Sequence, residues 1–377
     1  MASRLGFLST YPTTQCGIAT FCESLVTHLL DEGADVGVVQ LVDEPTPAVR
    51  PVVGEWVTSR PQDAVRVAAM LDRYDVAVVQ HEYGIFGGPD GEDVLEVAAL
   101  LHVPLVTVLH TVLTTPTPNQ YRVLARLVER SSAVVTMTAT ARDRLVAGWG
   151  ADPARVHVIP HGAPVESLSL ALGPQPPSSD RPTVLTWGLL SQGKGIEWAL
   201  RGLAELGDSM ALPSYRVVGQ THPRVREHEG EVYRDRLLAL TRDLGLSEAV
   251  HFDPRYQTGP ELREVVRRAD VVLLPYDSLE QVTSGVLTEA VAAGKPVIST
   301  SFPHAVELLS SGAGVLVPRR DPAAIAAALR HVLGEPGVAD SMAAVARSLA
   351  TSLVWPSIAR QYLRLSARLL TEVRAAS

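Results

Sequence analysis

The sequence lacks the features that mark several large classes of protein. It has 2 cysteines in 377 residues, too few for a disulfide framework or a zinc site. No apolar run reaches the length of about 18 residues that a transmembrane helix needs, and no signal peptide precedes the first predicted strand. The net charge of −8 gives no support for a nucleic-acid-binding surface. We therefore expect a cytoplasmic protein with no nucleic-acid partner and no transmembrane segment, while peripheral contact with a membrane is left open.

Several catalytic motifs are missing as well. The sequence has no G-x-S-x-G elbow, no G-x-G-x-x-G fingerprint and no EF-hand loop. The pair His81 and Glu82 lacks the second histidine of a zinc-binding H-E-x-x-H helix. The acidic residues between 90 and 93 form a loop and a helix start without supporting context. Nothing in the sequence therefore requires a metal.

The length and the composition indicate two globular domains. A chain of 377 residues exceeds what one hydrophobic core usually holds, and its 46% hydrophobic and 20% charged content is ordinary. Five prolines between residues 163 and 182 indicate a linker. We predict two doubly wound, Rossmann-like α/β domains facing one cleft, over residues 1–165 and 183–355. The linker covers residues 166–182, and a last helix covers residues 356–377.

Short apolar runs alternate with helical patterns along both halves, as in α/β proteins with parallel sheets. The runs predict strands over residues 4–9, 36–41, 76–79, 105–109, 133–137, 156–159, 184–187, 215–218, 250–252, 271–274, 297–300 and 314–317. The 3.6-residue pattern predicts helices over residues 18–30, 119–130, 196–206, 233–244, 261–268, 322–333 and 338–377, the last one interrupted at Trp355 and Pro356.

The β-α-β unit over residues 271–300 organises the second half. Its first strand is a buried run that ends at Pro275. Thr283 or Ser284 can cap the following helix, and Gly294 can close it. Ligands of open α/β sheets bind at the carboxyl ends of the strands, where this helix begins.

The start of that helix is a candidate anion site. Free backbone N–H groups of Ser284, Gly285 and Val286 would face the crevice and suit a diphosphate. Glu289, about one turn further, could accept hydrogen bonds from ribose hydroxyls. An ordinary crossover helix with a surface glutamate explains the same residues equally well.

The loop from Gly188 to Gly195 nearly matches a phosphate-binding P-loop. It follows a predicted strand, precedes a helix and contains Lys194, but Gly195 stands where the Mg²⁺-binding hydroxyl belongs. A P-loop-like NTPase is therefore a lesser alternative. Lys194 still suits a pyrophosphate, whereas a tight turn with a solvated lysine is the structural alternative.

Three positions in the first half also lie where strands end or helices begin. Gly17 opens a helix after the first strand and would let a ligand approach the backbone, unless it only serves a tight turn. His110 directly follows a predicted strand and is either a cleft residue or a structural histidine. His81 and Glu82 end the preceding strand before a glycine-rich loop, which could bind an acceptor.

Taken together, these motifs resemble the retaining glycosyltransferases of family 4, which have the two-domain GT-B architecture. The resemblance spans nearly the whole chain and is specific for the family but not for one sugar. The matching residues are Gly17 with its helix, His110, Val158-Ile159-Pro160-His161-Gly162, Lys194-Gly195, Glu289-Ala290 and Gly294-Lys295-Pro296-Val297.

The resemblance implies that a hexose moves from a nucleoside diphosphate sugar to an acceptor hydroxyl with retention and without a metal. The last helix would return to the first domain, which would bind the acceptor. The implied catalytic residues are His110, Lys194 and Gln281. The implied donor-binding residues are Gly17, Gly188, Lys194, Ser284, Gly285, Val286 and Glu289. The implied acceptor side consists of Tyr11, His81, Glu82 and Tyr83.

Two departures from the family pattern concern the donor site. Leu189 replaces an arginine, and Gln281 replaces a glutamate. Losing the arginine removes a phosphate cation, for which Arg224, Arg226 or Arg255 could substitute. A non-catalytic homologue that binds nucleotide sugars is therefore an alternative. Family frequency alone suggests a GDP-sugar such as GDP-mannose first and a UDP-sugar such as UDP-glucose second.

Overall fold

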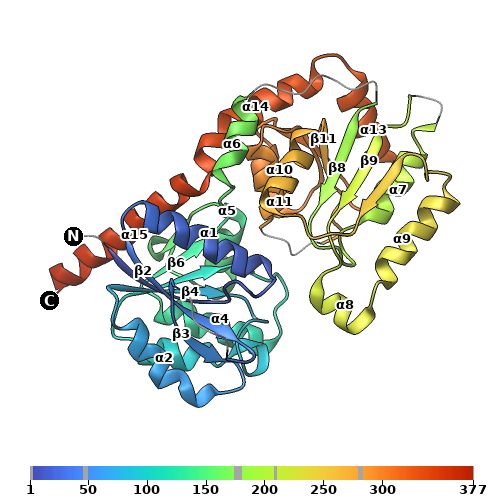
Figure 1. The fold of residues 1–377 in the computed structure, drawn as a ribbon. Helices are drawn as coiled ribbons and strands as arrows, with labels where there is room; N and C mark the ends of the chain where they lie inside the picture. The colour runs from blue at the N-terminus through green and yellow to red at the C-terminus, as the bar shows by residue number, and fades with distance from the viewer. Residues whose placement is uncertain (1–2, 46–49, 174–180, 208–209, 279–282, 377) are drawn as a thin grey trace. The chain divides into compact units, whose positions relative to one another are not determined.

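The computed structural model describes residues 3–45, 50–173, 181–207, 210–278 and 283–376. The chain forms two compact units. The first consists of Met1–Gly162 together with Trp355–Ser377, and the second consists of Ala163–Val354. Each unit has its own parallel sheet with helices on both faces (Figure 1).

The first unit is built on a seven-stranded parallel sheet. Its strand order is β3-β2-β1-β4-β5-β6-β7, so the first strand is central and β3 and β7 are the edges. The central strands are buried on both faces, which explains their nearly continuous apolar runs. The strands are β1 (Arg4–Ser9), β2 (Asp35–Val42), β3 (Val52–Val57), β4 (Val76–His81), β5 (Leu105–Leu109), β6 (Ala133–Thr136) and β7 (Val156–Val158).

Helices cover both faces of this sheet. On one face α1 and the last helix α15 share a core that includes Phe21, Trp355 and Tyr362. On the other face α2 and α3 pack around Trp56 and Leu71. The expected return of the last helix to the first unit is thus confirmed. The helices of this unit are α1 (Gly17–Asp31), α2 (Ala64–Leu71), α3 (Val94–Leu100), α4 (Pro118–Arg130), α5 (Ala139–Trp149) and α15 (Trp355–Ala376).

The second unit is built on a six-stranded parallel sheet. Its order is β10-β9-β8-β11-β12-β13, so the order of connection reverses next to β8. In open α/β sheets such a reversal leaves a crevice at the carboxyl ends of the strands. The strands are β8 (Thr183–Trp187), β9 (Ser214–Val218), β10 (Val250–Asp253), β11 (Val271–Leu274), β12 (Val297–Thr300) and β13 (Gly314–Val317).

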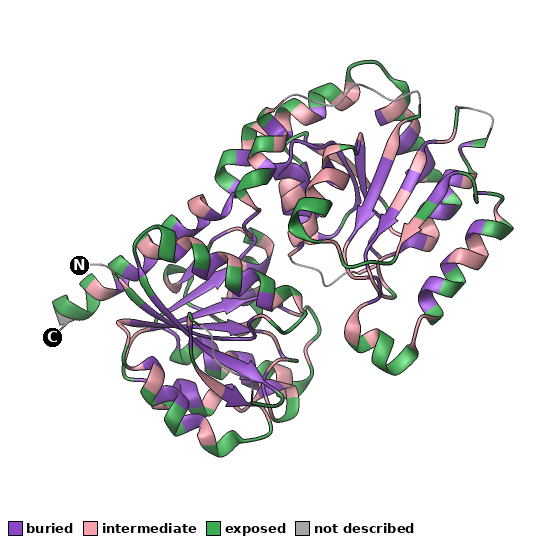
Figure 2. Cartoon of the chain, in the orientation of Figure 1, coloured by how far each residue is buried: buried purple, intermediate pink, exposed green. Residues whose placement is uncertain are grey.

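The helices of the second unit form two layers over this sheet. Burial is concentrated in the strands and on the inner faces of the helices (Figure 2). The helices are α6 (Val165–Leu172), α7 (Ile196–Ala204), α8 (Pro223–Glu229), α9 (Val232–Asp243), α10 (Gly259–Arg267), α11 (Gly285–Ala292), α12 (Pro303–Leu309), α13 (Pro322–Gly334) and α14 (Val338–Leu353).

The predicted strands are found, with small shifts at their ends, and further elements appear, among them strand β3 and helices α2, α5, α6, α8 and α12. Residues 166–172, expected to be linker, belong to helix α6, and residues 174–180 lie outside the described residues. Strand β3 has no predicted counterpart, because it is an edge strand whose run contains Gly54 and Glu55 and which exposes Val53. The predicted interruption at Trp355 is present, since α14 ends at Leu353 and α15 begins at Trp355.

Candidate active site

The carboxyl edge of the second sheet is organised around the loop after β8. The N–H of Gly188 donates to the Val218 carbonyl at 3.0 Å, and the N–H of Leu190 donates to the Gln220 carbonyl at 2.9 Å. A Cβ on Gly219 would lie 2.1 Å from the Gly188 oxygen, at a φ of +136°. The loops after β8 and β9 are therefore in direct contact, and only glycine fits at position 219.

The same loop also packs against the end of β11. Gly195 has a φ of +66°, and a Cβ there would lie 1.9 Å from the Pro275 carbonyl oxygen. This close approach explains why glycine stands at the position of the P-loop hydroxyl. The Lys194 ammonium lies 4.3 Å from the centre of the Tyr276 ring, a cation–π distance. No ion pair to Lys194 is found among the described residues.

The start of α11 lies beside this loop. A Cβ on Gly188 would lie 3.5 Å from the Val286 side chain. Ser284 caps the helix, because its hydroxyl accepts a hydrogen bond from the Leu287 N–H at 3.2 Å. The N–H groups of Gly285 and Val286 have no acceptor among the residues that the structure describes. The loop glycine and these N–H groups are thus neighbours, as a diphosphate site requires.

One part of the predicted anion site was wrong. The N–H of Ser284 is not free, because it donates to Nδ1 of His304 at 2.9 Å. Both residues are buried, with 4% and 5% of their surfaces exposed. His304 is the second residue of helix α12, so it holds the cap of α11 from a different element. The sequence offered no signal for this contact, since the two residues are separated by strand β12.

Glu289 lies about one turn into α11 and faces the end of β8. Its carboxylate accepts a hydrogen bond from the Trp187 side chain, and burial raises its pKa to about 7. The side chain is thus partly buried and hydrogen-bonded, so the structure does not support the fully solvated alternative. Gln281, the other residue expected near the donor sugar, lies outside the described residues.

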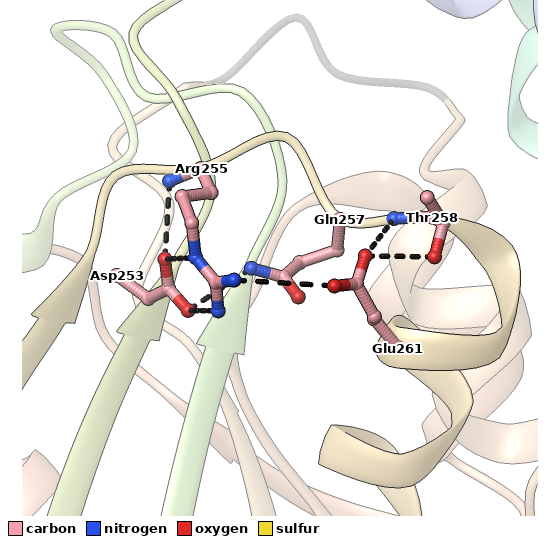
Figure 3. Close-up of polar contacts among 5 residues, drawn as sticks. All are labelled: Asp253, Arg255, Gln257, Thr258 and Glu261. Carbon is pink, nitrogen blue, oxygen red and sulfur yellow. Dashed lines mark hydrogen bonds and ion pairs between the residues drawn. The ribbon is translucent and has the colours of Figure 1, made fainter.

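The arginines that could replace the missing phosphate cation differ in their surroundings. Figure 3 shows that Arg255 is engaged by Asp253, with Nε–Oδ1 and Nη2–Oδ2 distances of 3.0 and 2.7 Å. Gln257 donates to the same carboxylate at 3.0 Å. Arg255 lowers the pKa of Asp253 to about 2, so the pair is ionised over the whole physiological range. Arg255 is thus committed to a local ion pair.

Arg224 lies closer to the Lys194 loop. Burial lowers the pKa of His222, and the charges of Arg224 and Lys194 lower it further. The side chains of Arg224 and Lys194 therefore both lie close enough to His222 to affect it electrostatically. The N–H of His222 donates to the Leu190 carbonyl at 2.8 Å, which fixes His222 beside the loop. Arg226 acts on Glu231 instead, whose pKa is lowered mainly by the hydrogen bond from the Thr221 hydroxyl and further by the charge of Arg226.

An ion-pair cluster that the sequence did not reveal occupies the same edge. Asp277, just after β11, accepts hydrogen bonds from Arg319 Nη1 at 3.0 Å and Arg320 Nε at 2.7 Å. The N–H of Asp277 donates to the Gly193 carbonyl at 2.8 Å. The two arginines follow β13, and this distance along the chain hides the cluster in the sequence. It ties the Lys194 loop to the ends of two further strands.

In the first unit, Gly17 is the first residue of α1. A Cβ there would meet no atom within 4 Å, and the backbone has no left-handed conformation that requires glycine. The preceding Cys16 caps the helix through its sulfur, which accepts from the Ala19 N–H at 3.4 Å. No steric reason for glycine is thus found in the described residues, and the space beside Gly17 is open.

His110 is held as a neutral hydrogen-bond donor. Its Nε2 lies 2.7 Å from Oε1 of Gln80, so Nε2 carries the proton. Burial lowers the pKa of His110 to about 3, and His161 and His81 contribute to the shift. The ring contacts Phe21 edge-on at 4.9 Å between centroids, and His161 contacts the same Phe21 at 5.1 Å. His110 is therefore positioned by its neighbours rather than free in solvent.

The predicted acceptor residues separate into a cluster and one outlier. Glu82 accepts from the Thr111 hydroxyl and from the Tyr83 N–H, and burial raises its pKa. His81 is fully buried beside Tyr83, with ring centroids 5.1 Å apart and no partner for either nitrogen among the described residues. Tyr11 lies elsewhere, and its carbonyl accepts from the Gln40 side chain at 3.0 Å. Of the acceptor side, Glu82 is the most accessible residue.

Two features are absent from the described residues. They contain no group of three or more His, Cys, Asp or Glu side chains arranged to hold a metal ion. Among them, no helix combines the length and the apolar character that a membrane crossing needs.

Comparison with known proteins matches both halves of the chain. The family model for Glycosyltransferase Family 4 matches residues 16–167, and the model for Glycosyl transferases group 1 matches residues 181–335. A D-inositol 3-phosphate glycosyltransferase of Rhodococcus opacus is 30% identical over 67% of this chain and 59% of its own length. A glycogen synthase of Mycobacterium tuberculosis is 28% identical over 62% of this chain and 53% of its own. The chain thus spans less than two thirds of these relatives.

Solved structures match over nearly the full length. Anabaena HepE in complex with UDP has a TM-score of 0.76 and 18% identity, covering 97% of this chain and 100% of that one. The sucrose-phosphate synthase of Thermosynechococcus elongatus has a TM-score of 0.72 and 18% identity, covering 99% and 100%. At this identity the likeness concerns the fold, and it confirms the GT-B architecture expected from the sequence.

Proposed function

Because the chain belongs to the glycosyltransferases of family 4, we propose that it transfers a hexose from a nucleoside diphosphate sugar to an acceptor hydroxyl, with retention at the anomeric carbon. One observation carries this proposal above all. One edge of the second sheet carries Lys194, Gly188 and the first two N–H groups of α11, for which the described residues offer no acceptor. A cation and a helix N-terminus at this place suit a diphosphate leaving group.

In the proposed reaction the second unit stabilises the departing diphosphate. Negative charge grows on the phosphate oxygens as the bond to the sugar breaks. Lys194 and the N–H groups of Gly285 and Val286 would meet that charge with donors that are already in place. Glu289 would accept hydrogen bonds from the ribose hydroxyls. Arg224, beside His222, would supply part of the charge that Leu189 lacks.

The first unit would contribute the acceptor side. Glu82 would bind an acceptor hydroxyl, since it is the accessible member of its cluster. His110 would orient the sugar as a neutral hydrogen-bonding group, and Gly17 would allow close approach to the backbone. In a retaining transfer without a protein nucleophile, the acceptor hydroxyl attacks on the side of the leaving group. Its proton passes to a phosphate oxygen of the departing diphosphate.

The departure at Leu189 favours one alternative, a homologue that binds nucleotide sugars without turnover. A donor screen separates the two functions. A ligand at a hundred times its dissociation constant adds about 2.7 kcal/mol to stability, so UDP-, GDP- and ADP-sugars can be ranked by thermal shift. Release of nucleoside diphosphate from the stabilising donor, faster with an acceptor, supports the transferase. Stabilisation without release across a broad acceptor panel supports the binder, and stabilisation by ATP alone would refute both.

A further inference from the structure

A cavity on the first unit is lined by none of the residues proposed for the transfer reaction. Its volume is about 740 Å³, within the range of about 300–1,000 Å³ typical of small-ligand sites. It is lined by the edge strand β7, by α5 and by the last helix α15. None of these elements carries a residue of the proposed transfer reaction, so this cavity needs an explanation of its own.

The cavity joins an apolar floor to cationic walls. Val156, Val158 and Leu365 supply apolar surface, and Val158 is 38% exposed although it belongs to a strand. The walls carry Arg142 from α5 and two arginines from α15, Arg364 and Arg368. The latter two are four residues apart, so they lie on the same face of the helix. None of the described residues that line the cavity is an aspartate or a glutamate, in a chain whose net charge is −8.

The arginines that line this cavity have few ion-pair partners among the described residues. Arg360, one turn before Arg364 on α15, is paired with Glu32 at 2.7 Å. By contrast, no ion pair to Arg364 or Arg368 is found in the part of the chain that the structure describes. The nearest acid to Arg142 is its neighbour Asp143, at 3.9 Å.

His157 also lines this cavity, and its pKa responds to the positive charge there. Burial lowers the pKa of His157, and the charge of Arg368 lowers it further, with Glu372 acting in the opposite sense. His157 therefore adds a neutral hydrogen-bonding group, and Gln361 adds another polar side chain.

We propose that this groove binds a phosphate ester. Three guanidinium groups around one cavity suit a phosphate, which they can bind through paired N–H donors. The apolar floor would accept the carbon portion of the ligand. Such a ligand could be a soluble phosphorylated compound or the headgroup of an anionic lipid, and both present the same chemistry to the arginines.

Two binding measurements on the full chain test the proposal and identify the source of the phosphate. The first is calorimetric titration with glycerol 3-phosphate. The second is co-sedimentation with phosphatidylcholine vesicles that contain or lack phosphatidylglycerol. We expect R364S/R368S to weaken binding of at least one probe tenfold or more. R142S should weaken the same probe, although it changes a different helix.

The control variant is R374S, which removes an exposed arginine of α15 outside the groove. It should change binding less than twofold. Loss of glycerol 3-phosphate binding in the groove variants assigns a soluble ligand, and loss of vesicle binding alone assigns a lipid headgroup. If neither probe depends on the groove arginines, or if R374S is as damaging as R364S/R368S, the proposal is overturned. Circular dichroism confirms that each variant is folded, as expected for side chains that are exposed or, at Arg142, half-buried.

Discussion

The two units differ in the charge of the side chains at their proposed sites. Burial lowers the pKa values of His81, His110 and His161 to between about 3 and 4, so these histidines are neutral. The second unit instead gathers Lys194 and, through Asp277, two arginines at the ends of its strands. We infer that the first unit orients substrate groups by neutral hydrogen bonds, whereas the second unit stabilises the negative charge of the diphosphate.

The largest expected effect follows from removing the cation of the second unit. Lys194→Ala should lower kcat by roughly 100-fold or more, the range seen when one preorganised donor to a developing charge is lost. The donor KM should change much less, because the interaction strengthens as the bond breaks. Steady-state kinetics with the donor found by thermal shift measure both constants. A variant that melts normally and keeps its kcat would show that the loop is only a turn.

The next effect concerns the histidine that holds α11. His304→Ala leaves the buried Ser284 N–H without an acceptor, which should cost about 1–3 kcal/mol of unfolding free energy. It should also lower kcat/KM by roughly 30-fold, because the helix start would shift relative to the diphosphate. Denaturant unfolding and steady-state kinetics measure the two losses.

His304→Asn is the matched control, since its side-chain oxygen can replace Nδ1 as the acceptor. It should recover most of the stability and most of the activity together. If alanine and asparagine proved equally active while both were folded, His304 would have no positioning role.

The sequence predicted what depends on local pattern. Apolar runs such as residues 271–274 are buried on both faces, so composition alone identifies them as central strands. The helix start follows in the same way, since the sequence offered Thr283 or Ser284 as the cap and the structure has Ser284 in that role. Edge strand β3 follows neither rule, because one face is partly solvated and its run is interrupted.

The contacts that complete the site could not be predicted. The bond from Ser284 to His304 and the pairing of Asp277 with Arg319 join residues on different elements. Their partners are decided by the order of strands in the sheet, which no local pattern specifies. The burial of Tyr11 is another such case, since it lies in a loop and yet only 7% of its surface is accessible.

Glu289 does not fit the contrast between the two units. It lies near the charged side chains of the second unit, but its carboxyl changes its charge near neutral pH. Its pKa in the folded protein is about 7, against an ordinary value of 4.5. Between pH 4.5 and pH 7 the carboxyl therefore keeps its proton in the folded state, whereas it is ionised in the unfolded state. The resulting stability is fully present below pH 4.5 and is lost as the pH rises through 7.

Glu289→Gln should therefore raise the unfolding free energy at pH 8, by up to about 3 kcal/mol, and change it little at pH 5. It should also raise the donor KM about tenfold at pH 8, equivalent to about 1.4 kcal/mol for one weakened charge-assisted hydrogen bond. The wild-type KM should rise as the pH falls through 7, and the variant should lose that dependence. Denaturant unfolding at both pH values and a KM–pH profile test this, and an unchanged stability at pH 8 would place the carboxylate in solvent.

The smallest expected effect is that of removing divalent metal ions, which should leave the activity nearly unchanged. It tests whether the positive groups of the second unit are sufficient to stabilise the diphosphate. If Lys194 and the start of α11 stabilise the diphosphate, no divalent ion is needed to neutralise the leaving group. Activity should then change less than twofold after dialysis against EDTA, whereas an enzyme that binds its diphosphate through Mg²⁺ or Mn²⁺ would lose nearly all turnover. Complete loss with recovery on adding Mn²⁺ would mean that these groups carry only part of the charge. Lys194→Ala, assayed with and without Mn²⁺, provides the comparison, because an ion that substitutes for the lysine would rescue the variant more than the wild type.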